Sequence, residues 1–224
     1  SCPRRPRLAL IACLNFQMKY AQHTLKMLVD SAGVEGWSEG RMRCTEPHYQ
    51  VCLDQAINNL LHVTSRWNPV SGSWVSWVRR YFNQTADWLA AQALRAQTAC
   101  CGWFRQGLVA GSSQVIGWSD GTSSADGAFG WVIVSRDPCA NSVTLEGVGG
   151  GFAPQCDSMM AETLGFLSLS EALKHRGDNQ GSPRNRGTCP QELWTTTYAK
   201  ALKQLRRPPT GPWPSDEANV FAQM

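Results

Sequence analysis

Residues 77–90 read WVRRYFNQTADWLA, and within them a strand pattern is followed by a helical pattern. Residues 73–78 alternate in the manner of a strand, with tryptophans among the apolar positions. Asn83 then begins a helical pattern that runs to residue 93, since asparagine is a favoured first residue of a helix. Asp87 lies one turn into that helix. The sequence therefore predicts a strand followed directly by a helix that carries an acid in its first turn.

Upstream of this stretch, a second acid follows an apolar run. Residues 25–29 form a short run typical of a buried strand, and Asp30 stands at its carboxyl end. Residues 32–34 are turn-like, and residues 49–63 have the apolar spacing of a helix. We expect the strand to present Asp30 at its carboxyl end.

Downstream lie three strand-like runs bounded by turn residues, which predict a meander of hairpins at 114–118, 128–135 and 142–148. Asp120 directly follows the first run. Ser158 is predicted to cap a helix over residues 159–175, and Glu162 lies in the first turn of that helix. Two further acids thus belong to a strand and a helix of the second half.

Bulk composition indicates a globular, reduced protein. Of the 224 residues 42% are hydrophobic and 17% charged, which is enough for a core. The nine cysteines are odd in number and irregular in spacing, so we expect free thiols and an intracellular, reducing compartment. The apolar run at residues 8–14 is too short to span a bilayer, which predicts no membrane partner. The net charge of +4 suits an anionic partner but is weak evidence alone.

Four of these patterns resemble the ribonuclease H family. WSDGTS at 118–123 with the following apolar run is similar to the family's first hairpin, and SMMAE at 158–162 to the start of its first helix. LVDSAGV at 28–34 resembles its fourth strand. The match at 77–90 is the most specific, because its Asn-x-x-Ala-Asp-x-Leu-Ala core resembles the closing helix.

The halves occur in the opposite order to that of the family, so the resemblance implies a circular permutation. We expect an α/β fold with a mixed five-stranded sheet flanked by helices on both faces, in which the strand ending at Asp30 lies beside the strand carrying Asp120. The predicted organisation is an N-terminal extension, a second half, a linker, a first half and a C-terminal extension, at 1–23, 24–97, 98–113, 114–175 and 176–224. The extensions include predicted helices at 8–20 and 191–206. Two incomplete domains in tandem are the alternative, but each acid appears once and none twice, which favours permutation.

The resemblance also implies a metal site formed by the four acids Asp120, Glu162, Asp30 and Asp87. Hydrolysis of a phosphodiester with two metals needs several carboxylates close together, because two Mg²⁺ or Mn²⁺ ions must be neutralised and still be open to substrate oxygens. Asp120 would bridge the two ions, and Asp87 would hold the hydrolytic one. The alternative for any single acid is a solvated surface carboxylate, and for Asp87 a charge favoured by the helix dipole.

A nucleic-acid contact is predicted for Arg79, Arg80 and Asn83, beside the last of these acids. The tryptophans at 74, 77 and 88 are able to stack on bases, but alternation along a strand more often marks core. Many members of the family carry a histidine in the loop before the last acid, whereas this chain has none between His62 and Asp87.

Three functions follow as hypotheses. The leading one is a metal-dependent endonuclease that cuts the RNA strand of an RNA/DNA hybrid, as domains of retroelements do. The second is a catalytically silent scaffold or binding module within a larger ribonucleoprotein, its extensions packing on protein partners. The third is an unrelated α/β protein in which the resemblance is coincidental.

Overall fold

The computed structural model describes residues 23–63, 67–69, 73–103, 114–137 and 142–178. Within these described residues, seven strands form one sheet: β1 His23–Val29, β2 Trp67–Pro69, β3 Val75–Trp77, β4 Cys100–Trp103, β5 Gln114–Ser123, β6 Gly127–Asp137 and β7 Ser142–Ala153. The helices are α2 Ala32–Ser38, α3 Pro47–Val63, the 3-10 turn η2 Arg80–Phe82, α4 Gln84–Ala96 and α5 Ser158–Asp178. The expected α/β class is confirmed.

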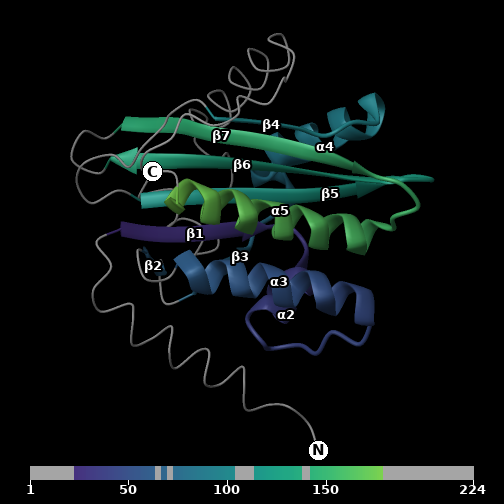
Figure 1. The fold of residues 1–224 in the computed structure, drawn as a ribbon, viewed down its shortest axis with the longest axis horizontal. Coiled ribbons are helices and arrows are strands. Elements are labelled where there is room, and N and C mark those ends of the chain that lie inside the picture. Colours follow the sequence, from purple (N-terminus) through teal and green to yellow (C-terminus); the bar gives the residue numbers. More distant parts are fainter. Residues whose placement is uncertain (1–22, 64–66, 70–72, 104–113, 138–141, 179–224) are drawn as a thin grey trace, which may run out of the picture.

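The sheet is mixed, with the order β2-β1-β5-β6-β7-β4 and with β3 also paired to β1 (Figure 1). β5, β6 and β7 form an antiparallel meander, and β1 lies parallel to β5. This confirms that the strand ending before Asp30 pairs with the strand carrying Asp120. The sheet has more than the five strands expected, because β2 and β3 pair with successive parts of β1 and because β4 is added beside β7.

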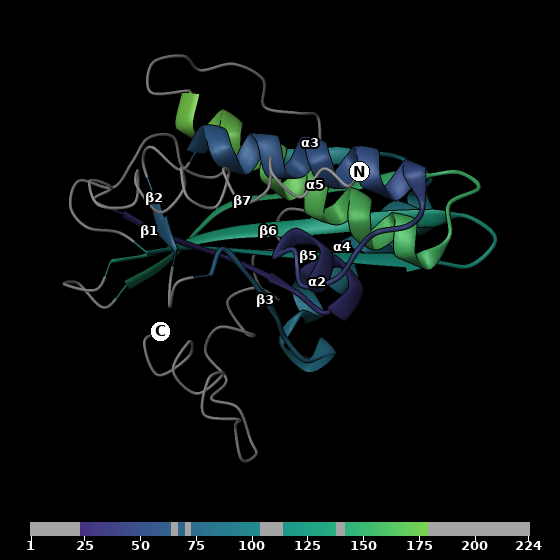
Figure 2. The same cartoon turned by 90° about the horizontal axis from the view of Figure 1, so that it is seen from below.

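Each face of the sheet has its own apolar core. Leu25, Met27 and Val29 of β1 belong to a cluster with α3 and α5, whereas Leu28 belongs to a second cluster with α4. Alternate residues of a strand point to opposite faces, so one strand supplies both cores. Figure 2 shows α3 and α5 together on one side of the sheet. Helices therefore cover both faces, as expected.

Two glycines allow helices to approach the sheet closely. A Cβ atom at Gly121 of β5 would lie 2.2 Å from the backbone nitrogen of Glu162, and one at Gly130 of β6 would lie 2.5 Å from the carbonyl oxygen of Ala86. Any side chain there would push α5 or α4 away from the sheet. The helices that carry two of the four acids thus lie directly on the strands.

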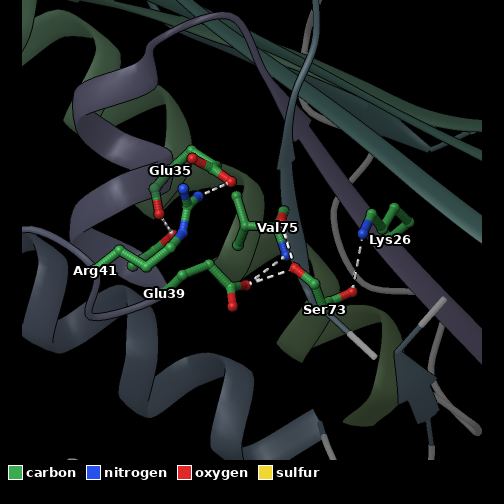
Figure 3. A network of polar contacts seen from close by, with 7 residues as sticks. Lys26, Glu35, Glu39, Arg41, Ser73 and Val75 are labelled. Carbon is green, nitrogen blue, oxygen red and sulfur yellow. Dashed lines mark hydrogen bonds and ion pairs between the residues drawn. The ribbon is translucent and has the colours of Figure 1, made fainter. Parts of the chain in front are cut away.

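A polar network ties α2 to β3 and β1 (Figure 3). The Glu39 carboxylate accepts hydrogen bonds from the Ser73 hydroxyl at 2.8 Å and from the backbone N–H of Val75 at 3.2 Å. Lys26 of β1 donates to the carbonyl of Ser73 at 3.1 Å, and its burial lowers the pKa of its ammonium group. The network fixes where β3 begins, and β3 leads into the segment that carries Asp87.

Several sequence expectations are corrected by the structure. Residues 32–38 form helix α2 rather than a turn, because the Ser31 hydroxyl accepts from the backbone N–H of Val34 and so starts the helix. The predicted linker contains strand β4, which pairs with β7. Asp157, not Ser158, caps α5, since its carboxylate accepts from the N–H of Met160 at 2.7 Å.

For the terminal helices, the cysteines and the membrane, the described residues test the sequence expectations only in part. The helices predicted at 8–20 and 191–206 lie outside the described residues. Three of the cysteines, Cys44, Cys52 and Cys156, are free thiols. Among the described helices, none combines the length and the apolar character needed to cross a bilayer.

Candidate metal centre

Three carboxylates from three separate elements converge at one end of the β1–β5 pair. Asp30 follows β1, Asp120 lies in β5, and Glu162 lies in the first turns of α5. One oxygen of each lies within 4.8 Å of the others. The parallel pairing of β1 with β5 brings the two aspartates to the same end of the sheet, and the close approach of α5 over Gly121 adds the glutamate.

Asp120 is the buried centre of this cluster. Asp120 has 0% relative exposure, and neither oxygen of its carboxylate has a hydrogen-bond partner. Burial, then a hydrogen bond with Asp30 that forms only when a proton lies between the two carboxyl groups, and then the charges of Asp30 and Glu162 raise the pKa of Asp120 to about 10. Without a cation, the charged form of this side chain is therefore strongly disfavoured.

Glu162 experiences the same environment in weaker form. Burial and the charge of Asp30 raise its pKa to about 8, while the backbone N–H of Gly121 and the guanidinium of Arg80 oppose the rise. Two neighbouring carboxyl groups thus have pKa values raised above their ordinary range. Such raised values are common where carboxylates are gathered for a cation or for acid–base chemistry.

The fourth predicted acid, Asp87, is not part of this three-carboxylate group. Its Oδ1 atom accepts a hydrogen bond from Nη2 of Arg80 at 2.7 Å, and the two groups form an ion pair. Asp87 nevertheless lies close enough for its charge to raise the pKa of both Asp120 and Glu162. The structure therefore brings three of the four acids together and places the fourth beside them, paired with an arginine.

The side chain of Asn83, predicted to contact nucleic acid, is fully buried and turned toward the acidic cluster. Its amide Nδ2 donates to Oδ1 of Asp30 at 3.1 Å and to the carbonyl oxygen of Ser119 at 2.8 Å. Asn83 begins α4, yet it makes no capping hydrogen bond with its side chain. The usual stabilisation by such a cap, about 1 kcal/mol, is given up in favour of contacts in the acidic site.

Arg79 and Arg80, the other predicted nucleic-acid contacts, are exposed. Arg80 lies beside the acids, since its hydrogen bond to Asp87, and then the charges of Asp120 and Asp30, raise the pKa of its guanidinium. Trp77 is 43% exposed, and its indole Nε1 donates to the backbone carbonyl of Asp30 at 2.9 Å. Trp74 is buried in the core, as its strand pattern favours. Sequence reasoning missed this bond of Trp77 and the inward role of Asn83; the only signal for Asn83 was its place in the Asn-x-x-Ala-Asp-x-Leu-Ala motif.

The donor set fits a hard divalent cation. Carboxylate oxygens are the ligands that Mg²⁺ and Mn²⁺ prefer, and the three acids supply no nitrogen or sulfur. A cation would interact with the two orphaned oxygens of Asp120, which are otherwise a costly exception to the rule that buried polar atoms are paired. The residues present therefore fit a site for such an ion.

Comparison with known proteins gives no assignment. No family model matches the chain, and no curated protein matches it. Among solved structures, the dodecamers of a single-substitution variant of PelC and of PelC from Paraburkholderia phytofirmans are similar to it, each with a TM-score of 0.31 and with 8% and 11% identity, respectively. Each alignment covers 72% of this chain and 91% of that chain. Likeness at this level carries no argument about fold family or function.

Proposed function

We propose that this protein is a metal-dependent endonuclease of the ribonuclease H type, which hydrolyses the RNA strand of RNA/DNA hybrids with Mg²⁺ or Mn²⁺. The observation that carries the proposal is the cluster of Asp30, Asp120 and Glu162, in which a fully buried aspartate has two unpartnered oxygens. A protein gathers repelling carboxylates at a cost in stability, and a bound divalent cation offsets that cost.

The proposed fold is a ribonuclease H-like domain with its halves in permuted order. Its support is the parallel pairing of β1 with β5, because these are the strands that resemble the family's fourth and first strands. The strand–helix segment 77–90, which resembles the family's closing elements, contributes the last residue of β3, η2 and the start of α4 beside the same site. The permutation itself remains part of the proposal.

The residues divide the chemistry between them. Asp120 is suited to bridge two ions, because both of its oxygens are unpartnered, while Asp30 and Glu162 complete the first ligand set. Asp87 is suited to hold a second ion once its pairing with Arg80 is broken. Divalent ions would supply an activated water and stabilise the leaving 3′ oxygen. Arg80, beside Asp87, and Arg79, the exposed residue before it in the chain, are suited to contact phosphates of the substrate.

The test is cleavage of a labelled RNA/DNA hybrid, compared with duplex DNA, in millimolar Mg²⁺ or Mn²⁺. The wild type should cut the RNA strand of the hybrid and leave duplex DNA intact. Asp120→Asn should reduce cleavage to background, because it removes the charge from the bridging ligand. Asp54→Asn changes an exposed acid of α3 and should retain activity. The enzymatic proposal is refuted if the folded wild-type protein shows no cleavage, or shows only cleavage that persists in Asp120→Asn.

A catalytically silent scaffold is the second candidate, and two observations favour it. Arg80 neutralises Asp87, the acid proposed for the hydrolytic ion, and the chain has no histidine between His62 and Asp87. A silent scaffold would bind hybrid or RNA without cutting it, in the same assay, and would engage protein partners through its extensions. For either function we propose a reducing, intracellular setting, which the three free thiols support.

A further inference from the structure

Asn83 occupies an unusual place for the first residue of a helix. Its backbone carbonyl accepts from the N–H of Asp87 at 3.0 Å, as expected where α4 begins. Its side chain makes no hydrogen bond within the helix, is fully buried, and reaches Asp30 after the end of β1 and Ser119 within β5. Helix-starting asparagines usually accept from their own helix, so this orientation needs another explanation.

The chemistry of the two partners fixes how the amide is oriented. Oδ1 of Asp30 and the carbonyl oxygen of Ser119 are both acceptors, so the NH₂ group must face them and the amide oxygen must face away. That oxygen is buried and without a hydrogen-bond partner. A buried orphaned acceptor is costly, which means that the two donated bonds are retained at the expense of a third.

The two bonds link the acids of the cluster through their own chain segments. Asp30 belongs to the cluster directly, and Ser119 immediately precedes Asp120 in β5. One amide thus holds the carboxylate of the first acid and the backbone beside the second. Because Asp30 and Asp120 repel each other when charged, a donor that fixes the first relative to the second decides where a cation finds its oxygens.

We propose that Asn83 is the positioning residue of the metal centre: it orients the Asp30 carboxylate and locks the end of β1 to β5, so that the three carboxylates are preorganised for a divalent ion. This inference rests on the proposed function only for the presence of the ion, not for cleavage. Asn83 acts through Asp30 and has no contact with the ion or the substrate.

The experiment measures Mn²⁺ affinity by titration calorimetry, on the full chain, in a double-mutant cycle. Asn83→Ala should weaken Mn²⁺ binding about tenfold, the lower end of what loss of a partner to a metal ligand costs. In an Asp30→Ala background the same change should alter affinity by less than about twofold, because the group it positions is absent. Asn83→Ser, which keeps one donor, should fall between the wild type and Asn83→Ala.

Asn59→Ala is the matched control. Asn59 is also a buried asparagine, and its amide donates to the Ser170 hydroxyl at 3.2 Å, between α3 and α5. Its replacement should lower the melting temperature yet leave Mn²⁺ affinity unchanged. If Asn83→Ala does not fold, Asn83→Ser is carried through the same cycle, with the same dependence on Asp30 expected.

Two results would overturn the inference. Equal losses of affinity with and without Asp30 would reduce Asn83 to a general structural role, and unchanged affinity in Asn83→Ala would remove any role at the centre. A wild type that binds no Mn²⁺ would overturn both this inference and the proposed function. A wild type that binds Mn²⁺ with the expected cycle but cuts no hybrid would contradict the endonuclease alone.

Discussion

Asp120 and Asp87 are the same residue type in very different surroundings. Asp120 is buried with both oxygens orphaned, whereas Asp87 lies at a helix start, partly exposed and paired with Arg80. The environment, not the residue type, therefore determines their roles. The charged form of Asp120 needs a bound cation, whereas Asp87 is already paired with the guanidinium of Arg80. At the scale of single residues, this difference predicts unequal affinities for two ions.

Arg80→Gln should strengthen the binding of a second Mn²⁺ ion. The guanidinium of Arg80 competes with that ion for the carboxylate of Asp87. Its removal frees the carboxylate and takes away a positive charge that repels the ion. Both partners are well exposed, so their pairing is worth at most about 1 kcal/mol, and affinity should rise roughly fivefold. Counting bound Mn²⁺ by electron paramagnetic resonance gives the measurement. Arg79→Gln removes a neighbouring exposed charge, and an equal effect in that variant would exclude specific competition at Asp87.

At the scale of elements, the start of α5 is held from two sides. Asp157 accepts from the N–H of Met160 through one oxygen and from the Tyr49 hydroxyl of α3 through the other, both at 2.7 Å. The bond from Tyr49 and the backbone bond at the helix start lower the pKa of Asp157, and the pKa of Tyr49 is raised to about 12. This cap fixes the turn of α5 that carries Glu162.

Asp157→Ala should destabilise the fold by about 1 kcal/mol at neutral pH, the usual value of a helix cap. Because the folded-state pKa of Asp157 lies below its unfolded value of 3.8, its contribution is present above that pH and is lost as pH falls through the folded-state value. Urea unfolding at pH 7 and at pH 3 measures the difference between wild type and variant. A penalty that grows on acidification would contradict the assigned cap.

Gly121→Ala should be far more damaging than its single methyl group suggests. The new Cβ would lie 2.2 Å from the backbone nitrogen of Glu162, and backbone cannot rotate away as a side chain can. We expect a loss near the upper end of overpacking costs, about 3 kcal/mol, together with weaker Mn²⁺ binding because α5 moves. Gly33→Ala, where the nearest atom is the flexible end of Met159 at 3.2 Å, is the control. Equal unfolding free energies for the two variants would disprove the close packing of α5 on β5.

Local patterns predicted most elements because their signals are local. The apolar run of β1, the strand-like runs of β5 and β6 between turn residues and the helical spacing of α3 reflect which residues are buried, and all are visible in sequence. Helix α2 and strand β4 were missed because α2 depends on the cap at Ser31 and β4 on its partner β7. Neither the cap of α2 nor the pairing of β4 with β7 can be recognised from the spacing of apolar residues.

The metal centre was predictable in part for the same reason. All four acids were identified from local motifs, and three of them cluster, because whether a carboxylate faces a cluster or an arginine depends on the residues packed around it. Asp87 has Arg80 within hydrogen-bond distance, and no pattern over residues 77–90 revealed that pairing. Asn83 was placed correctly at the start of a helix, yet the direction of its side chain is set by Asp30 and Ser119, which are distant in sequence.

For the whole molecule, the central feature is the pairing of a strand from the first part of the chain with a strand from the second. β1 and β5 lie parallel over six residue pairs, and the acids at their shared end meet only because that pairing forms. The side chain of Asn83 adds hydrogen bonds to Asp30 and to the backbone of Ser119 across the same junction. Site and fold are therefore coupled: whatever separates β1 from β5 also disperses the carboxylates.

The most direct test of the metal centre is the anomalous scattering of a crystal soaked in millimolar Mn²⁺. A peak is expected within about 2.5 Å of carboxylate oxygens from Asp30, Asp120 and Glu162, and it should be absent from crystals of Asp120→Asn. A wild-type crystal with no ion at these three residues, or with ions only elsewhere, would contradict the proposed metal centre.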